Sequence, residues 1–402
     1  MLDGSTLKIM LLDDEPIMLK LHARILKNQG FTDVICHESG QAALDGFEGA
    51  NGHPNLILMD LNMPEMDGIE FVRHLVDRKY VGSLILISGE DERMLQATEK
   101  LVQAHQIVVL GHLRKPVSPQ AVATLLAKWV PATGSKKRAA ATMYCADEVR
   151  AAIANGELVN YYQPKVEVES GRFVGVETLV RWRHPKVGMI FPDQFIAVAE
   201  ANDLIDDLTR SVLAAALKQA KEWHNAGLEL KVAVNISVDN LASLSFADYV
   251  VGLSLDSGVQ PRNVILEVTE SRLMADLRSP LEILTRLRLK RFKLSIDDFG
   301  TGHSSLVQLR DIPFDELKID RSFVHGVGSD ETLQAIFNSS LGLAQQLGMD
   351  VVAEGVEDIA DWQFLKQSGC KLAQGYFIGR PMPASELPTW INAWKARVLD
   401  GF

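Results

Sequence analysis

Acidic residues follow the apolar runs of the first third of the chain, where carboxylates could bind a cation. Asp13 and Asp14 follow LKIMLL, and Asp60 follows NLILM. Ser88 ends SLILIS, and Lys115 follows IVVLGHLR. Because the carboxyl ends of parallel strands meet at one edge of a sheet, these side chains are expected to converge. The pattern predicts a Mg2+ site beside Asp60, whose carboxylate could attack a phosphoryl group that Ser88 and Lys115 contact.

A second series of oxygen donors follows apolar runs in the rest of the chain. Its members are Glu177, Asn235, Glu267, Asp297, Asp298, Asp320 and Glu354. In a barrel of parallel strands the carboxyl ends all open on one face, so these side chains are expected to surround one pocket. A ring of carboxylates requires cations, and oxygen ligands favour Mg2+ or Mn2+ over zinc. Two such ions would serve the hydrolysis of a phosphoester.

Two residues of this region could act directly in that reaction. Lys318 lies two positions before Asp320, so both are expected on one face of a strand, where the ammonium could steady a phosphate or the attacking water. Glu354 could accept the proton of the attacking water. The stretch DDFGTGHSS, residues 297–305, predicts a mobile loop beside the ions, and Glu270 is placed to anchor it.

Each of these residues also has a plain structural interpretation. Asp and Ser often cap helices that follow strands. Glu270 and Glu357 could form only ion pairs on helix faces, which stabilise a helix weakly. The order of the strand ends nevertheless favours the functional interpretation, because four suitable side chains follow four successive runs in the first region alone.

The hydrophobic pattern predicts the elements that position these residues. Short apolar runs alternate with amphipathic stretches before residue 131, which is typical of a parallel sheet with crossover helices. The same alternation resumes after residue 146 over about 250 residues, which suits a (β/α)8 barrel. The segment PATGSKKRAAAT, residues 131–142, interrupts it with small and basic residues and is interpreted as a linker. We expect an α/β chain with a flavodoxin-like (βα)5 domain (1–130), a linker (131–146) and a TIM-like barrel (147–402).

The composition excludes several classes of protein. Of 402 residues, 47% are hydrophobic and 23% charged, which is typical of a folded globular chain. The net charge of -11 disfavours binding to DNA or to anionic lipid. Cys36, Cys145 and Cys370 lack the spacing of a zinc site or a disulfide framework. Because the sequence contains neither an apolar run of roughly 18 residues nor a basic segment before an apolar core, we expect a cytoplasmic protein without membrane contact.

The first set of residues resembles the receiver domain of two-component response regulators. The resemblance extends from residue 7 to about residue 130 and includes DLNMPEMDG and the Lys-Pro pair at 115–116. It implies phosphorylation by a sensor histidine kinase or a phosphotransfer protein. The residues that it assigns are Asp60 as phosphoacceptor, Asp13 and Asp14 as Mg2+ ligands, and Ser88 and Lys115 as the residues that sense the acyl phosphate.

The second set resembles the EAL family of cyclic di-GMP phosphodiesterases, from about residue 147 to residue 395. The motif that names the family is Glu177-Thr178-Leu179, within an E-x-L-x-R pattern that Arg181 closes. The resemblance implies hydrolysis of cyclic di-GMP to linear pGpG with two Mg2+ or Mn2+ ions. It assigns metal ligation to Glu177, Asn235, Glu267, Asp297, Asp298 and Asp320, catalysis to Lys318 and the base Glu354, substrate contacts to Gln163, Pro164, Leu179 and Arg181, and support of the loop and site to Glu270, Glu357 and Gln374.

Two histidines stand where these families commonly have an aromatic residue. His112 precedes Lys115 by three positions, at the place of the switch residue of many receivers. His303 lies in the loop after Gly302. Their roles stay open, as does the direction in which phosphorylation of Asp60 changes the activity, because a two-state interface could release or inhibit the barrel.

Two other functions compete with the phosphodiesterase. One is a catalytically silent barrel that binds cyclic di-GMP and acts through a partner protein. It would be marked by loss of a metal-binding acid or of the base, and none is missing. The other is a transcription factor, which would need a basic recognition helix that the sequence does not offer. The family resemblance also favours a homodimer or a higher assembly.

Overall fold

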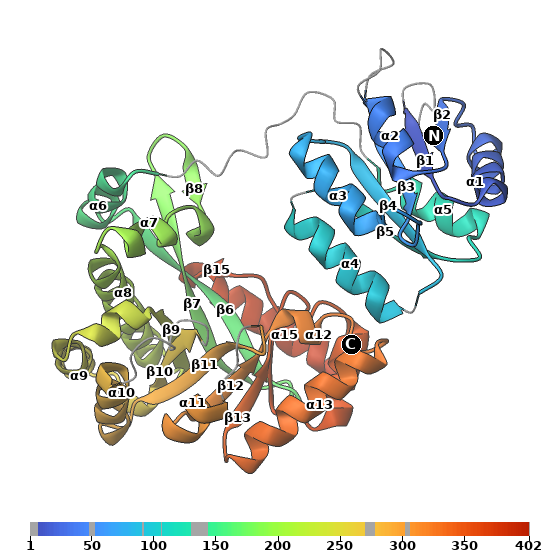
Figure 1. Cartoon of the computed structure of the whole chain (residues 1–402). Coiled ribbons are helices and arrows are strands. Elements are labelled where there is room, and N and C mark those ends of the chain that lie inside the picture. Colours follow the sequence, from blue (N-terminus) through green and yellow to red (C-terminus); the bar gives the residue numbers. More distant parts are fainter. Residues whose placement is uncertain are drawn as a thin grey trace. The chain divides into compact units, whose positions relative to one another are not determined.

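The chain forms two compact units, residues 1–139 and residues 140–402 (Figure 1). The computed structural model describes residues 7–47, 53–90, 92–105, 107–129, 144–269, 278–301 and 306–401. The expected linker at 131–142, Glu270 and His303 lie outside these residues.

The first unit is a five-stranded parallel sheet in the order β2-β1-β3-β4-β5. Its strands are β1 (Ile9–Leu12), β2 (Val34–His37), β3 (Leu56–Asp60), β4 (Ser83–Ser88) and β5 (Val108–Arg114). Its helices are α1 (Pro16–Asn28), α2 (Gly40–Phe47), α3 (Gly68–Asp77), α4 (Glu92–Ala104) and α5 (Pro119–Leu126). The expected flavodoxin-like fold is therefore confirmed.

Apolar side chains pack against both faces of this sheet. Leu19 of α1 and Val122 of α5 belong to the core on one face, and Phe71 of α3 and Leu95 of α4 to the core on the other (Figure 1). The strand β2 was not among the apolar runs identified in the sequence. Its apolar run is only three residues long, Val34–Cys36, and none of the four strand residues is buried, so its hydrophobic signal is weaker than that of the other strands.

The second unit is a closed barrel of eight strands in the order β6-β14-β13-β12-β11-β10-β9-β7, in which β7 pairs with β6. The strands are β6 (Leu158–Glu167), β7 (Phe173–His184), β9 (Lys231–Ile236), β10 (Val264–Thr269), β11 (Lys293–Phe299), β12 (Glu316–Ile319), β13 (Asp350–Ala353) and β14 (Leu372–Gln374). Two short strands extend the sheet, β8 (Gly188–Ile190) on β7 and β15 (Met382–Pro383) on β6. The expected barrel is confirmed.

Helices surround the barrel strands (Figure 1). The α-helices are α6 (Ala146–Ala154), α7 (Ile196–Ala201), α8 (Ile205–Asn225), α9 (Ser245–Ser257), α10 (Arg278–Leu289), α11 (Leu306–Asp311), α12 (Arg321–Val324), α13 (Glu331–Gln346), α14 (Ile359–Ser368) and α15 (Leu387–Asp400). The 3-10 helices are η1 (Pro192–Gln194), η2 (Val238–Ala242), η3 (Pro261–Asn263) and η5 (Ala384–Glu386).

The strands β6 and β7 differ from the sequence-based expectation in two ways. The barrel is not wholly parallel, because β6 runs antiparallel to both β7 and β14. The segment between Glu167 and Phe173 is too short for a crossover helix, so the two strands form a hairpin. In addition, β7 continues to His184, so Glu177 lies within the strand instead of at its end. In this hairpin Gln163 lies opposite Glu177.

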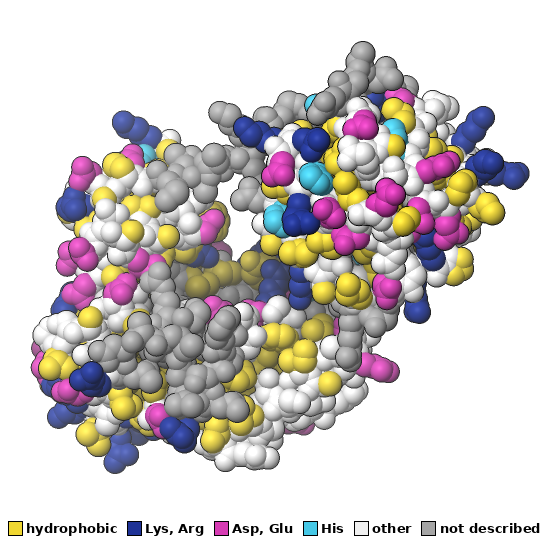
Figure 2. Space-filling model, in the orientation of Figure 1, with side chains coloured by type: hydrophobic (Ala, Val, Ile, Leu, Met, Phe, Trp, Pro, Cys, Tyr) yellow, Lys and Arg dark blue, Asp and Glu magenta, His cyan; other side chains and the backbone are white. Residues whose placement is uncertain are grey.

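The surface contains both kinds of charge. On the face in Figure 2, the described acidic and basic side chains are interspersed over each unit. Within the described part of the chain, no helix has both the length and the apolar composition that a membrane span requires.

Candidate active site

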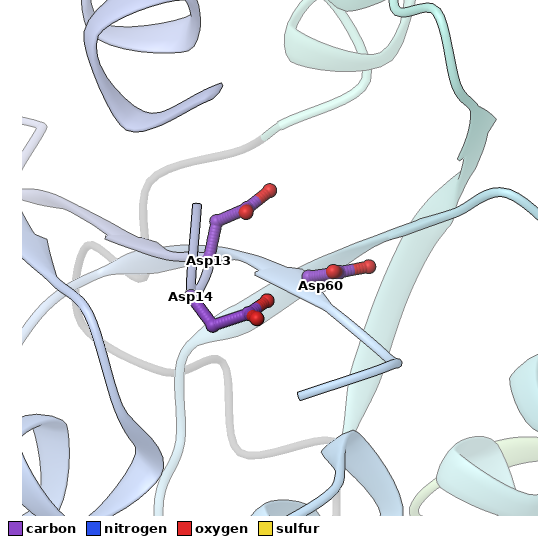
Figure 3. Close-up of side chains that lie close together, drawn as sticks. All are labelled: Asp13, Asp14 and Asp60. Atoms are coloured by element: carbon purple, nitrogen blue, oxygen red, sulfur yellow. The ribbon is translucent and has the colours of Figure 1, made fainter. Parts of the chain in front are cut away.

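Three carboxylates lie together at the carboxyl edge of the first unit's sheet. Asp13 and Asp14 follow β1, Asp60 ends β3, and the three side chains point to the same side (Figure 3). One oxygen of each lies within 4.8 Å of one oxygen of the others. Lys115 Nζ lies 3.1 Å from Asp13 Oδ2 and 3.0 Å from Asp60 Oδ2, and Ser88 ends the neighbouring strand β4, fully buried. The structure thus brings all five expected residues to one edge.

At this edge of the sheet, carboxylate oxygens are available to bind a cation. Burial raises the pKa of Asp60, although the hydrogen bond and charge of Lys115 act in the opposite direction. Asp60 Oδ1 is buried and accepts no hydrogen bond from the described residues. A cluster of carboxylates with such an oxygen fits Mg2+, which binds oxygen ligands.

In the barrel, a buried ammonium group lies among the carboxylates. Lys318 of β12 is 1% exposed. The oxygens around its Nζ are Glu354 Oε1 at 2.8 Å, Glu267 Oε2 at 3.0 Å, Asp297 Oδ1 at 3.0 Å and Glu177 Oε2 at 3.6 Å. Lys318 is therefore central to the site.

Strand register explains why residues so far apart in sequence meet here. Glu267 of β10 lies opposite Asn235 of β9, and Thr269 lies opposite Asp297 of β11. Asn235 is exposed, and its Nδ2 donates a hydrogen bond of 2.8 Å to Glu177 Oε1. The strands thus direct an amide and three acids to one mouth of the barrel.

Glutamine side chains complete the surroundings of Glu177. Gln374 Nε2 donates to Glu177 Oε2 at 2.5 Å and to Gln163 Oε1 at 2.9 Å. Gln163 Nε2 in turn donates to the carbonyl of Gly379 at 3.1 Å. These hydrogen bonds fix the orientation of the Glu177 carboxylate.

The acids form two neighbouring groups that share Asp297. One consists of Glu177, Glu267 and Asp297, and the other of Asp297, Asp298 and Glu354; within each group, one oxygen per residue lies within 4.8 Å of the others. An all-oxygen donor set with a shared carboxylate fits two hard divalent cations.

When no cation is bound, the negative charge of these acids is reduced by raised pKa values, which favour their protonated forms. Burial raises the pKa of Glu267 to about 8 and raises the pKa of Glu354 well above its ordinary value, although Lys318 opposes both shifts. Burial would also raise the pKa of Glu177, but the charge of Lys318 and two amide hydrogen bonds lower it. Burial acts to lower the pKa of Lys318, but the surrounding carboxylates raise it, so the ammonium persists.

Asp298 and Asp320 lie at irregular backbone. Asp298 has a φ of +56°, where the pairing between β11 and β12 shifts register, and a left-handed conformation is strained for a residue other than glycine. Burial and the charges of Asp297 and Asp320 raise the pKa of Asp298 to about 6. The expectation that Asp320 shares a strand face with Lys318 is wrong, because β12 ends at Ile319 and Asp320 caps α12 by accepting a 2.9 Å hydrogen bond from the Ser322 amide.

A cavity of 300 Å³ opens beside these acids. Its lining residues are Gln163, Glu177, Leu179, Asp297, Asp298, Lys318, Arg321, Glu354, Gly355, Glu357, Gln374, Gly375 and Tyr376. Pro164 is buried beside Gln163. Arg181 does not line the cavity; its guanidinium lies 5.1 Å from the ring centre of Phe191. Glu357 forms a 2.7 Å ion pair with Arg321.

Family comparisons match both parts of the chain. The model of the EAL domain matches residues 146–381, which is more than half of the chain. The chain belongs to the EAL domain family. The model of the response regulator receiver domain matches residues 9–127, so the first unit is a receiver domain.

One of the similar proteins matches nearly the whole chain, and others match the EAL region. Cyclic di-GMP phosphodiesterase RocR of Pseudomonas aeruginosa is 34% identical over 380 residues, which cover 94% of this chain and 96% of RocR. Cyclic di-GMP phosphodiesterase NbdA of the same organism is 40% identical over 259 residues, which cover 64% of this chain and 33% of NbdA. The solved structure "PaMucR Phosphodiesterase, c-di-GMP complex" is 41% identical with a TM-score of 0.57, covering 60% of this chain and 98% of that chain.

Lys165 and Glu316 of the EAL domain were not identified from the sequence as site residues. Both are buried below the acids, and Lys165 Nζ lies 2.8 Å from Glu316 Oε1. A signal was present for Glu316, because it precedes Lys318 by two positions on the same strand and so shares its inward face. For Lys165 the signal was a charged residue next to Pro164 and Val166 in the buried part of its strand.

Proposed function

We propose that the EAL domain hydrolyses cyclic di-GMP to linear pGpG and that phosphorylation of Asp60 modulates the rate. The observation that carries this proposal is the pair of carboxylate groups that share Asp297 around the buried ammonium of Lys318. The similarity to RocR over nearly the whole of both chains supports the same reaction and the same combination of domains.

The donor set fits two Mg2+ or Mn2+ ions. The residues that would hold them are Glu177, Asn235, Glu267, Asp297, Asp298 and Asp320. Divalent ions bound there would lower the pKa of the attacking water and offset the charge that develops on the phosphate. Asp297 would be the shared ligand, because it belongs to both acid groups.

The side chains of the chain itself supply the proton transfer and the positioning. Glu354 accepts a proton from the water as the water oxygen bonds to phosphorus, and the phosphorus–oxygen bond to the ribose breaks. The departing ribose oxygen takes up a proton, from solvent or from the protonated Glu354, and leaves as a hydroxyl. Lys318 offsets negative charge beside Glu354, 2.8 Å away. Gln163, Pro164, Leu179 and Arg181 are the proposed contacts to the dinucleotide, and Glu357 and Gln374 are the proposed supports of the site.

The receiver is the proposed regulatory part. Asp13 and Asp14 would hold Mg2+, and Asp60 would accept the phosphoryl group from a histidine kinase or a phosphotransfer protein. Ser88 and Lys115 would contact its oxygens, a role that the short distances from Lys115 to Asp13 and Asp60 support. A cytoplasmic location and a homodimer or higher assembly are part of the same proposal, and light scattering of the full chain tests the assembly.

Turnover of cyclic di-GMP by the purified full chain tests the proposal. We expect conversion to pGpG with Mg2+ or Mn2+, loss of conversion with a chelator, and a changed rate after treatment with acetyl phosphate. Chromatography of the nucleotides measures the product. Binding of cyclic di-GMP without any conversion would instead indicate a silent signalling module.

A further inference from the structure

A second buried ion pair lies beneath the acids of the active site. Lys165 of β6 is 3% exposed, and its Nζ lies 2.8 Å from Glu316 Oε1 and 3.6 Å from Glu267 Oε1. Ser295 Oγ donates a 3.1 Å hydrogen bond to Glu316 Oε1. Lys165 thus bridges Glu316 and an acid of the active site.

The two oxygens of Glu267 have different surroundings. Oε2 lies 3.0 Å from Lys318, whereas Oε1 is buried, accepts no hydrogen bond from the described residues and lies 3.6 Å from Lys165. A carboxylate with 0% exposure is costly to hold as an anion unless cations lie close to it. Lys318 and Lys165 therefore act on different oxygens of the same carboxylate.

We propose that Lys165 is a positioning residue of the active site: held by Glu316, its ammonium retains Oε1 of Glu267 and so directs Oε2, the oxygen on the side of Lys318, toward a divalent ion. This inference rests on the proposed function, in which Glu267 is a metal ligand. In this proposal the Lys165–Glu316 pair orients a metal ligand and does not only fill the interior of the barrel. Partners of metal ligands orient the ligand and tune its affinity for the ion in this way.

The position of Lys165 can be reached from the other mouth of the barrel. A cavity of 260 Å³ is lined by Lys165 and Glu316 together with residues at the amino ends of the parallel strands, among them Lys231 and Asp350. It is distinct from the cavity beside Glu354, and the two share no lining residue. A small alkylammonium ion can therefore enter where the Lys165 side chain has been removed.

Binding of Mn2+ to the full chain tests the proposal independently of hydrolysis. The main variant is Lys165→Met/Glu316→Gln, which removes one charge of each sign, so that no buried charge is left alone and the net charge is unchanged. Electron paramagnetic resonance of free Mn2+ measures the affinity. We expect the Kd for Mn2+ to rise about tenfold or more, as is typical when a partner of a metal ligand is lost.

Three further variants separate positioning from folding. Lys371→Met is the matched control, because Lys371 lines the same cavity and pairs with Asp350 at 2.6 Å instead of Glu267; its Mn2+ affinity should equal that of the wild type. Lys165→Arg keeps the charge and should retain most of the affinity. The Lys165→Ala variant should regain affinity for Mn2+ when ethylammonium is added. The Mn2+ affinity of the Lys371→Met variant should not change on the same addition.

The outcomes distinguish this inference from the proposed function. A double variant that is folded by circular dichroism and binds Mn2+ like the wild type overturns the inference, as does a wild type that binds no Mn2+. If the single Lys165→Ala variant does not fold, the Mn2+ affinities of the double variant and of Lys165→Arg test the inference. A wild type that binds Mn2+ but converts no cyclic di-GMP rejects the proposed function, while the difference in Mn2+ affinity still tests Lys165.

Discussion

A single lysine accounts for much of the electrostatics of the EAL site. Lys318 is completely enclosed, and four carboxylates lie within 3.6 Å of its Nζ. One positive charge cannot neutralise four negative ones, and the raised pKa values of Glu267 and Glu354 favour protons on these two acids in the metal-free protein, which offset part of the remaining charge. Divalent cations can take the place of these protons, which is why metal binding and pH should be linked in this protein.

The proposed base leads to the first prediction. Glu354→Gln keeps the size and polarity of the side chain but cannot accept the proton, so we expect kcat to fall by about 10²–10⁴-fold. Affinity for cyclic di-GMP should be largely retained, because Gln163 and Leu179 are unchanged. Product chromatography and calorimetric titration measure the two quantities. Turnover close to that of the wild type would reject Glu354 as the base.

The second prediction concerns stability and pH. Burial raises the pKa of Glu267 from 4.5 to about 8, and burial with neighbouring acids raises that of Asp298 from 3.8 to about 6. Between about pH 4 and pH 8 these two groups therefore bind more protons in the folded metal-free protein than in the unfolded chain, so their contribution to the free energy of unfolding falls as the pH rises. We expect a lower urea midpoint in chelator at pH 8 than at pH 5.

Glu267→Gln provides the control for that measurement. This variant cannot titrate at residue 267, so the fall in its midpoint between pH 5 and pH 8 should be smaller. Added Mn2+ should also reduce the fall in the wild type, because the ion supplies the missing positive charge. A wild-type midpoint that rises over this range in chelator would contradict the prediction.

At the scale of elements, the end of β14 is packed tightly against the backbone that follows β13. The Val356 amide donates to the Gln374 carbonyl at 3.1 Å, and the Phe377 amide donates to the Val356 carbonyl at 3.0 Å. A Cβ at Gly375 would collide with the backbone nitrogen and oxygen of Val356. The two segments carry Glu354 and Gln374, so their close approach sets the position of both side chains.

The third prediction follows from this contact. Gly375→Ala should lower the free energy of unfolding by about 1–3 kcal/mol, as is usual for overpacking, and should also reduce turnover because Gln374 is displaced. Gly342→Ala is the matched control, because it lies inside α13 with no atom within 4 Å of its added Cβ. That change should leave turnover unchanged and stabilise the helix by up to about 1 kcal/mol. If both substitutions changed stability and turnover equally, the contact between Gly375 and Val356 would not explain the effect of Gly375→Ala.

At the scale of the molecule, each unit has a core of its own. The buried clusters of the receiver contain only residues up to Trp129, and the buried cluster of the barrel begins at Tyr144. Every proposed ligand and catalytic residue of the EAL site lies in the second unit. The hydrolysis of cyclic di-GMP and its regulation by phosphorylation should therefore be separable when the chain is divided between the two units.

The fourth prediction is that a fragment of residues 140–402 folds and converts cyclic di-GMP. Its rate should not respond to acetyl phosphate, because it lacks Asp60. Circular dichroism and product chromatography provide the measurements. A fragment that is unfolded under conditions where the full chain is folded would show that the barrel depends on the receiver.

The fifth prediction concerns the full chain. Asp60→Asn keeps the shape of the side chain but removes the attacking carboxylate, so labelling by radioactive acetyl phosphate should be lost. The rate of cyclic di-GMP turnover should then no longer respond to the phosphoryl donor, while its basal value stays measurable. Labelling that persists in the variant would point to a different acceptor.

The sequence alone was sufficient for the fold class, and it singled out most of the acidic residues that the structure brings together. Alternating apolar and amphipathic segments predicted a parallel sheet and a barrel, because side-chain periodicity reflects which face of an element is buried. The acids at the strand ends could be identified because parallel strands bring their carboxyl ends to one edge. These inferences need only local order along the chain.

The tertiary structure decided what depends on pairing between distant segments. It set the antiparallel direction of β6, the end of β12 before Asp320, and the meeting of Gln163 with Gln374 across 211 residues. It also decided that Lys165 and Glu316 meet beneath Glu267. Strand register selects which side chains meet inside a closed barrel, and the hydrophobic pattern of one segment does not contain that register.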